Sequence, residues 1–529
     1  MIRRCASLLP LLLLAGACAS QGPAPQPAHA QASLTPSAYD ASGDIFYEFM
    51  PIAWRYGEPG GPTPDEARAN RFGNFQGMID SIPYLKTLGV TAVWMTPIFP
   101  SPAYHDYQHG AADSLNPWFG PEADFLRFIK EARAANIKVF IDFVAYGINQ
   151  DSPWFKDAHN NPASPFAHQF AFTDDACSTF VGYSFKTWDG GRVGFINWDL
   201  RNADAQSRVT GWSNKWLDPN GDGDCSDGVA GYRLDHVWAH YAPQGKPAPG
   251  GWGYNIDSFW IPWKRELEKV NPKVFTFAEQ ADWGSFGADL LPAHDAAFTK
   301  PFEAAARQAL RNEDATRLYE SMAATLAALP KGRTSLLTIG DHDVDRLASA
   351  IGADEKGHEG RARAAAAVLM LGPLPPVIYY GDELGMLGKA GNYKSDANDI
   401  PRREPMKWKA TAAPPMTNYF ALHQGAFEHR YEHDHDGRSV EEQDGSKDSL
   451  LTLYRNLAQA RLAEPALSHG EYIPQPCPDK AVWRFIKAYQ GRRVEVAINL
   501  SSKPAELAAA DGKPYTLPAY AWQIGELSK

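Results

Sequence analysis

Cysteine is scarce in this chain, which has 5 cysteines among its 529 residues. Their spacing does not match the paired ligands of a structural zinc site. Cys5 and Cys18 fall in the N-terminal segment, so Cys177, Cys225 and Cys477 remain for the folded part. An exported chain meets oxidising conditions, in which Cys177 could pair with Cys225. The sequence leaves both that disulfide and the free thiols open.

Long basic runs are also missing, and the formal net charge is −11 at pH 7. A protein that binds nucleic acid through its phosphates needs clustered lysine and arginine, so we expect no nucleic-acid partner. Apolar residues make up 44% and charged residues 21% of the chain, which is typical of globular proteins. The length allows a large core together with an appended domain.

No apolar run is long enough to span a bilayer, and this includes the N-terminal run 8–17. Arg3 and Arg4 precede the apolar run 8–17, which is typical of a signal peptide. The sequence LLAGAC then resembles a bacterial lipobox, in which Cys18 would carry the lipid. A second cleavage signal, AHA at 28–30, would instead release a soluble protein. We therefore expect an exported protein, either a lipoprotein of the cell envelope with a membrane contact only through its lipid anchor, or a periplasmic or secreted protein.

Short apolar segments rich in β-branched and aromatic residues alternate with amphipathic helical patterns. Eight such strand-like segments begin near residues 44, 90, 137, 228, 273, 294, 335 and 376. Helical periodicity falls between them, for example at 76–88, 121–136, 256–270 and 361–371. This alternation predicts an α/β fold with a parallel sheet covered by helices, and eight units predict a closed (β/α)8 barrel.

Two regions depart from the alternation. Residues 149–227 are rich in Asn, Asp, Pro and aromatics and show little helical periodicity, so we expect an inserted subdomain after strand 3. Beyond the last long helical pattern, AVWRFIKAY, RRVEVAINL and YAWQIGEL predict a small C-terminal antiparallel β domain. The predicted organisation is a signal peptide at 1–18, a flexible tether at 19–43, the barrel at 44–148 and 228–464, the inserted subdomain at 149–227 and a C-terminal β-sandwich at 465–529.

Charged side chains occur inside the fourth predicted strand, in the sequence GYRLDH. Strand side chains alternate, so Arg233 and Asp235 point to the same face. Burying a charged pair in a strand is costly, which favours a functional role over a structural one.

Acidic residues also stand where other predicted strands end. The third ends near Asp142, the fifth at Glu279, and the seventh at His342 and Asp343. Active sites of such barrels form at the C-terminal ends of the strands, so we expect these side chains to meet at one mouth. One acid at a strand end is often a turn residue, but several from different strands indicate a functional site.

Several segments resemble the α-amylase family of retaining α-glucoside hydrolases. GYRLDH resembles its nucleophile segment, FTFAEQ its acid/base segment, IGDHDVDR its N-H-D-x-x-R segment, AYHDYQ its H-G-Y segment and PPVIYYGDELGM its eighth strand. The resemblance covers about residues 44–462. It implies an enzyme that cleaves α-glucosidic bonds in starch-derived or related α-glucans with retention of configuration, so an α-glucan or malto-oligosaccharide is the expected partner.

The resemblance also implies a role for each side chain. Asp235 would be the nucleophile, Glu279 the acid and then the base, and Asp343 a sugar ligand that favours the distorted ring. Arg233 would keep Asp235 ionised. The implied substrate-binding residues are Tyr107, His105, Arg233, His342, Arg346 and Asp142.

Some positions depart from the family pattern. DFVAYG stands where D-x-V-x-N-H is usual, so Tyr146 replaces an Asn that ligates calcium and Gly147 a His that binds the reactive sugar. Asp341 replaces the usual Asn of the N-H-D segment. We expect the reactive sugar to lose one hydrogen-bond donor and the usual calcium site to be absent or rebuilt. Our hypothesis is that Tyr146 occupies the vacated space.

A different Ca²⁺ candidate is the segment DPNGDGDCSDG. Asp218, Asn220, Asp222 and Asp224 have the alternating spacing of an EF-hand-like loop. The twelfth position is Val229 rather than Glu, so the loop is incomplete, and an acidic turn that binds nothing is the alternative. No organic cofactor is expected.

Two other functions stay open on the sequence. A transglycosylase would pass the glycosyl group to a sugar and would differ only in its acceptor-site loops. A non-catalytic, sugar-binding surface lipoprotein would keep the fold without activity. The presence of Asp235, Glu279 and Asp343 together favours an enzyme.

Overall fold

The computed structural model of the chain describes residues 33–59, 61, 63–239, 249–422, 430–509 and 512–527. The predicted signal peptide, the lipobox and the first part of the predicted tether lie outside these residues. Within the described ranges, no helix is both long and apolar enough to cross a membrane.

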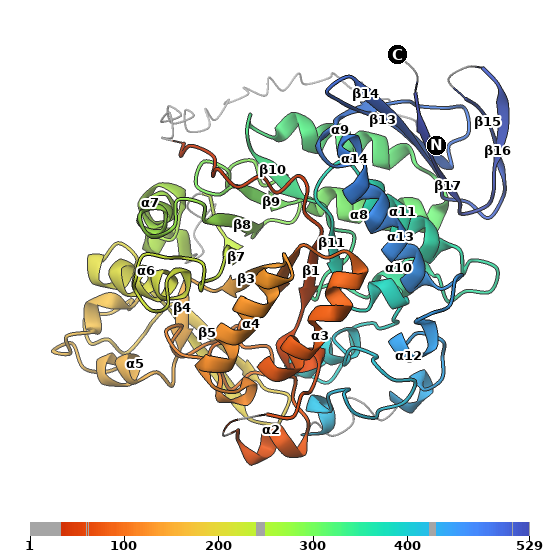
Figure 1. The fold of residues 1–529 in the computed structure, drawn as a ribbon. Helices are drawn as coiled ribbons and strands as arrows, with labels where there is room; N and C mark the ends of the chain where they lie inside the picture. The colour runs from red at the N-terminus through yellow and green to blue at the C-terminus, as the bar shows by residue number, and fades with distance from the viewer. Residues whose placement is uncertain are drawn as a thin grey trace, which may run out of the picture. The chain divides into compact units, whose positions relative to one another are not determined.

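Eight parallel strands form the central sheet and confirm the predicted barrel (Figure 1). In spatial order they are β10 (Thr334–Leu336), β9 (Ala296–Phe298), β8 (Phe275–Gln280), β7 (Gly231–Val237), β3 (Lys138–Phe143), β2 (Ala92–Met95), β1 (Phe46–Phe49) and β11 (Val377–Tyr379). A parallel bridge between Leu337 and Pro376 joins the two ends of this order. The sheet therefore closes on itself, as a (β/α)8 barrel requires.

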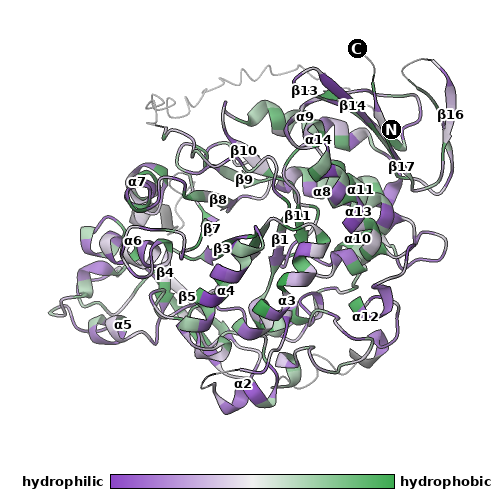
Figure 2. Cartoon of the chain, viewed as in Figure 1, coloured by the Kyte–Doolittle hydropathy of each residue, from purple (hydrophilic) through white to green (hydrophobic). Residues whose placement is uncertain are grey.

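Helices connect the strands and cover the outside of the barrel (Figure 1). The longer ones are α3 (Phe75–Leu88), α4 (Glu122–Ala134), α6 (Ala203–Leu217), α7 (Ile261–Val270), α8 (Lys300–Asn312), α9 (Thr316–Ala328), α11 (Arg361–Leu371) and α13 (Leu450–Ala463). The buried residues of α4 follow the i, i+3, i+4, i+7 pattern of one helix face, at Phe125, Phe128, Ile129 and Ala132. Figure 2 shows the matching mixture of hydrophilic and hydrophobic residues along this helix.

Aromatic side chains fill the inside of the barrel. The cluster includes Phe46, Trp94, Phe140, Phe275, Phe277 and Phe298, all fully or almost fully buried. Successive residues of a strand face opposite sides, so Glu48, Asp142 and Glu279, each two positions later, point inward in the next layer. The strands thus place a layer of charge directly above a layer of aromatic rings, at the C-terminal end of the barrel.

The predicted insertion after the third barrel strand contains a separate antiparallel sheet. Its strands, in the order β4-β6-β5, are β4 (Gly147–Asn149), β6 (Arg192–Asn197) and β5 (Gly182–Lys186). Our expectation of little helix in 149–227 was wrong, because α6 spans fifteen of these residues. Its buried residues Ala205, Val209, Trp212 and Trp216 recur at spacings of three or four, so the helical signal was present in the sequence.

The C-terminal region forms the predicted antiparallel sheet. Its strands are β12 (Glu471–Pro474), β13 (Val482–Tyr489), β14 (Arg492–Asn499) and β17 (Trp522–Glu526), with a hairpin of β15 (Ala505–Ala508) and β16 (Pro514–Leu517) beside them. The hydroxyl of Tyr319 in α9 accepts a 2.7 Å hydrogen bond from the backbone N–H of Arg484 in β13. The ring of Phe302 in α8 packs against Trp483 with centroids 5.9 Å apart. The sheet is thereby packed onto the barrel helices.

The three cysteines of the described part are free thiols. Of the two possibilities left open by the sequence, the structure therefore has Cys177 and Cys225 unpaired.

Candidate active site

One guanidinium group organises the acids at the barrel mouth. Nη1 of Arg233 on β7 donates hydrogen bonds of 2.8 Å to Asp142 on β3 and of 2.8 Å to Asp235 on its own strand. Nη2 donates a 2.8 Å bond to Oε2 of Glu279 on β8. Arg233 and its three acidic partners are all buried. As the alternation of β7 predicts, Arg233 and Asp235 share a face, and the neighbouring strands bring the other acids to them.

The surroundings shift the pKa values of two of these acids, Asp235 and Asp142, in opposite directions. Burial acts to raise the pKa of Asp235, but hydrogen bonds and charges from His236 and Arg233 outweigh burial and lower it. Burial raises the pKa of Asp142 to about 7, against the opposing effect of Arg233. Of Asp235 and Asp142, Asp235 is therefore the one that is held ionised at neutral pH, which suits a nucleophile.

Asp343, His342 and Arg403 form a second charged group, across the barrel mouth from Arg233 and its acids. Asp343 accepts a 2.8 Å hydrogen bond from Nη2 of Arg403 and lies 3.3 Å from Nε2 of His342. Burial acts to raise the pKa of Asp343, but the two cations outweigh it and hold the pKa well below its usual range. Asp343 is thus also ionised, and its side chain remains partly exposed to the cleft.

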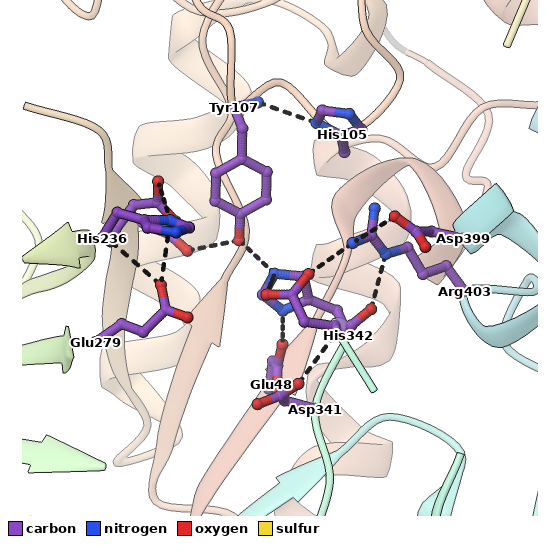
Figure 3. A network of polar contacts seen from close by, with 12 residues as sticks. Glu48, His105, Tyr107, His236, Glu279, Asp341, His342, Asp399 and Arg403 are labelled. Atoms are coloured by element: carbon purple, nitrogen blue, oxygen red, sulfur yellow. Dashed lines mark hydrogen bonds and ion pairs between the residues drawn. The ribbon is translucent and has the colours of Figure 1, made fainter. Parts of the chain in front are cut away.

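Tyr107 joins the two groups (Figure 3). Its hydroxyl donates a 2.9 Å hydrogen bond to Oδ2 of Asp142 and lies 2.8 Å from Nε2 of His342. Its ring stacks on that of His342, with centroids 5.4 Å apart. The ring of His105 lies 5.7 Å from that of Tyr107, and burial together with Arg403 lowers the pKa of His105 to about 3, so this imidazole is neutral.

A cleft of about 480 Å³ opens above these side chains. Asp235, Asp343, His342, His105 and Tyr107, all predicted from the sequence, line it. Glu279 lies just beneath, nearly fully buried, and its Oε1 accepts a 2.9 Å hydrogen bond from the indole of Trp283. The inserted sheet supplies Tyr183 and Phe185 to one wall, and the segment 394–403 supplies the other.

Three residues predicted to bind substrate do not line the cleft: Arg233 and Asp142 are buried beneath it in the ion-pair network, and Arg346 lies apart from that network. Arg346 is fully buried, and its Nη1 donates a 2.7 Å hydrogen bond to the carbonyl of Tyr380. Its guanidinium lies 4.9 and 4.8 Å from the ring centroids of Tyr379 and Tyr380. Those contacts turn Arg346 toward the loop after β11, so we correct the expectation of a direct substrate contact.

The departure at Gly147 has a steric cause. A Cβ atom at this position would lie 2.2 Å from the ring of Phe195 and 2.5 Å from the carbonyl oxygen of Ile196, both in β6. Only glycine allows β4 to approach β6 this closely. Tyr146 lines the cleft, with its ring 5.3 Å from Phe195 and 6.4 Å from His236, as our hypothesis for the vacated space requires.

The departure at Asp341 has an electrostatic counterpart. Its carboxylate forms an ion pair with Lys300, the first residue of α8, and Lys300 also lies 3.5 Å from Glu303. Burial acts to raise the pKa of Asp341, but the charge of Lys300 outweighs burial and lowers it. The ammonium of Lys300 also lies 4.3 Å from the ring centroid of Trp283. A buried lysine thus compensates for the charge that replaces a neutral side chain.

Sequence reasoning missed four side chains at the site. Glu48 on β1 contacts His342, with Oε1 2.5 Å from Nδ1. Arg403 holds Asp343, Lys300 holds Asp341, and His236 stands next to Asp235. Glu48 had a usable signal, because it is an acid inside an apolar strand, as Asp235 is.

The predicted calcium loop forms an exposed turn. Its side chains accept backbone hydrogen bonds of the turn itself, from Gly221 and Gly223 to Asp218 and from the N–H of Asp222 to Asn220. Asp224 likewise accepts from Ser226. In the described part of the chain, the one group of three or more His, Cys, Asp or Glu side chains spaced to hold a metal ion is Asp235, His236 and Glu279. The loop therefore does not gather its carboxylates into a cage.

Comparisons with known proteins identify a catalytic-domain family and several relatives. The family model for the α-amylase catalytic domain matches residues 63–470. Alpha-amylase 3 of Dictyoglomus thermophilum is 23% identical over 454 residues, which cover 82% of each chain. Neopullulanase 2 of Thermoactinomyces vulgaris is 25% identical over 388 residues, which cover 69% of this chain and 59% of that relative.

Solved structures show the same fold. A crystal structure of an α-amylase from H. orenii has a TM-score of 0.74 at 21% identity and covers 92% of this chain and 99% of that one. A cyclic α-maltosyl-(1→6)-maltose hydrolase from Arthrobacter globiformis has a TM-score of 0.69 at 20% identity and covers 93% of this chain and all of that one.

Proposed function

This chain belongs to the α-amylase family of glycoside hydrolases, and on that premise we propose that it cleaves α-glucosidic bonds in starch-derived or related α-glucans with retention of configuration. Relatives named amylase and neopullulanase support the substrate class. The observation that carries the retaining mechanism is the spacing of two acids: a carboxylate oxygen of Asp235 and one of Glu279 lie within 4.8 Å of each other. Retaining glycosidases have carboxyl groups about 5–5.5 Å apart, whereas inverting ones need about 6.5–9.5 Å.

The first half of the reaction forms a covalent glycosyl-enzyme. Asp235, held ionised by Arg233, attacks the anomeric carbon, and the bond from that carbon to the departing oxygen breaks. Glu279 gives its proton to the departing oxygen. In the second half, Glu279 takes a proton from water, and the water oxygen displaces Asp235 from the same carbon. Two displacements on one carbon restore the original configuration.

The other cleft residues hold the sugar while charge develops on it. Asp343 is ionised and partly exposed, so it can accept hydrogen bonds from sugar hydroxyls and stabilise an oxocarbenium-like ring. Tyr107 offers a ring at the cleft whose hydroxyl is fixed by Asp142 and His342. A sugar hydroxyl in place of water at the second step would give transglycosylation by the same intermediate.

We also propose that the protein is exported, as a lipoprotein of the cell envelope or otherwise as a periplasmic or secreted protein. The basic pair Arg3 and Arg4, the apolar run 8–17 and the lipobox-like sequence ending at Cys18 support this proposal.

A product assay tests the proposed reaction. The chain without residues 1–30 is incubated with α-1,4-linked malto-oligosaccharides, and proton NMR follows the anomer released first. We expect α-anomers, and a loss of about 10⁴-fold in kcat for Asp235→Asn. Circular dichroism of that variant controls for its fold. Early release of β-anomers would contradict retention, and equal turnover by the variant would contradict the role of Asp235.

A further inference from the structure

His236 is a cleft residue that the proposed reaction uses neither as nucleophile nor as acid or base. It follows Asp235 at the end of β7 and lies beside Glu279 (Figure 3). Its side chain is 52% exposed and lines the cleft. Its φ of +46° lies in the left-handed region, which is unfavourable for any residue with a Cβ atom. Its backbone N–H donates a 3.2 Å hydrogen bond to Oε2 of Glu279. Strained backbone of this kind is often found at functional sites.

The strained backbone places three ligand atoms together. Nδ1 of His236 lies 3.6 Å from Oδ2 of Asp235 and 3.9 Å from Oε2 of Glu279. One ligand atom from each residue lies within 4.8 Å of the others. A zinc ion binds nitrogen and oxygen at about 2.0–2.2 Å in a tetrahedron, so its ligands lie about 3.4 Å apart. The two separations from Nδ1 are close to this spacing, and the carboxylate oxygens of Asp235 and Glu279 must approach each other for the three residues to hold one ion.

Three carboxyl groups, those of Asp142, Asp235 and Glu279, surround the single guanidinium of Arg233. Burial acts to lower the pKa of His236, but Asp235 and Glu279 outweigh burial and raise it to about 9, so an ion must displace a proton from this imidazole and should bind more tightly as pH rises. Arg233 contacts Oδ1 of Asp235 and leaves Oδ2 facing His236. Oε2 of Glu279 is shared with Arg233, which weakens its bond to an ion.

We propose that Asp235, His236 and Glu279 form a reversible binding site for Zn²⁺ or a similar first-row divalent cation. An imidazole with two carboxylates is a ligand set that zinc accepts, and the open cleft leaves the fourth position to water. Because the ion would occupy both acids of the proposed reaction, the ion and an α-glucan exclude each other. The site thus makes the protein sensitive to the free concentration of such a cation.

Isothermal titration of the full chain with ZnCl₂, in the absence of sugar, tests the site directly. We expect one Zn²⁺ per chain at the site, and binding at least tenfold weaker in His236→Asn. Asparagine tolerates the left-handed backbone and is a poor zinc ligand. The matched control is His168→Asn, because His168 also lies beside a carboxylate, 2.9 Å from Asp204, but on the exposed surface. The control should bind Zn²⁺ as the unaltered chain does.

Inhibition gives a second readout. With malto-oligosaccharide as substrate, Zn²⁺ should raise the apparent KM without changing kcat, and the inhibiting concentration should rise at least tenfold in His236→Asn. If His236→Asn does not fold, as judged by its thermal transition, His236→Gln replaces it. Zinc binding as tight in the His236 variant as in the unaltered chain would overturn the proposal. The titration requires no turnover, so a failure of the proposed reaction leaves this test intact.

Discussion

At the scale of single residues, His342 connects the acids of the cleft to the first barrel strand. Its Nδ1 lies 2.5 Å from Glu48, and its Nε2 lies 3.3 Å from Asp343. Burial acts to lower the pKa of His342, but Asp343 and Glu48 outweigh burial and raise it to about 9. The imidazole is therefore positively charged at neutral pH and keeps Asp343 ionised.

This raised pKa predicts how stability depends on pH. An unfolded histidine titrates near 6.5, so the stabilisation from His342 is complete below pH 6.5 and is lost as pH rises through about 9. The full shift corresponds to about 3 kcal/mol. Glu48→Gln removes one of the two acids that raise the pKa of His342. The free energy of unfolding of this variant should therefore fall less steeply between pH 6.5 and pH 9 than that of the unaltered chain. Urea unfolding at pH 6.5 and pH 9 measures the difference.

Glu441→Gln is the control for this experiment. Glu441 is also paired with a cation, 2.8 Å from Lys409, but both side chains are exposed. Its pH dependence between 6.5 and 9 should match that of the unaltered chain. An equally steep fall in Glu48→Gln would show that Glu48 does not set the pKa of His342.

At the scale of elements, the contact between β4 and β6 shapes one wall of the cleft. Gly147→Ala would place a methyl group against Phe195 and the carbonyl of Ile196. Overpacking of this kind costs about 1–3 kcal/mol, and a shift of β6 would also move the cleft wall, so kcat/KM should fall. Thermal unfolding and steady-state kinetics measure both effects.

Gly211→Ala in α6 is the matched control for the same substitution. No atom lies within 4 Å of a Cβ built at Gly211. Alanine favours a helix over glycine by about 1 kcal/mol, so this variant should be as stable as the unaltered chain or slightly more stable. Equal stability of the Gly147 and Gly211 variants would show that β4 can move away from β6.

The elements also show what a sequence can and cannot predict. All eight barrel strands were predictable, because each is a short apolar run and several end in an acid or histidine, as at Asp142 and Glu279. The pairing of Lys300 with Asp341 was not, because the two residues are 41 positions apart and meet only when α8 and the end of β10 are packed. The sequence around His236 also gives no signal that predicts its left-handed backbone conformation.

At the scale of the whole molecule, the lipobox-like sequence predicts where the protein is found. When the chain is expressed in a bacterium that processes lipoproteins, Cys18→Ser should move it from the detergent phase to the aqueous phase of a Triton X-114 extraction. The variant would lack the proposed lipid anchor, and such an anchor supplies membrane affinity in proportion to its buried CH₂ groups. Cys477→Ser, which alters a free thiol of the folded part, should stay in the detergent phase. An unaltered chain found in the aqueous phase would indicate cleavage after Ala30 instead.

The aromatic layer inside the barrel has a consequence for how the site responds to its substrate. Phe46, Phe140 and Phe277 lie directly beneath Glu48, Asp142 and Glu279, so these charges meet no polarisable solvent from below. The cleft above the layer is therefore the nearest place for water to screen these charges, and a sugar that enters displaces water from the cleft. Every charge–charge interaction in the layer then strengthens together, because its energy varies inversely with the local dielectric constant. Substrate binding therefore strengthens the charge–charge interactions among the groups that act on the substrate, and no strand has to move for this.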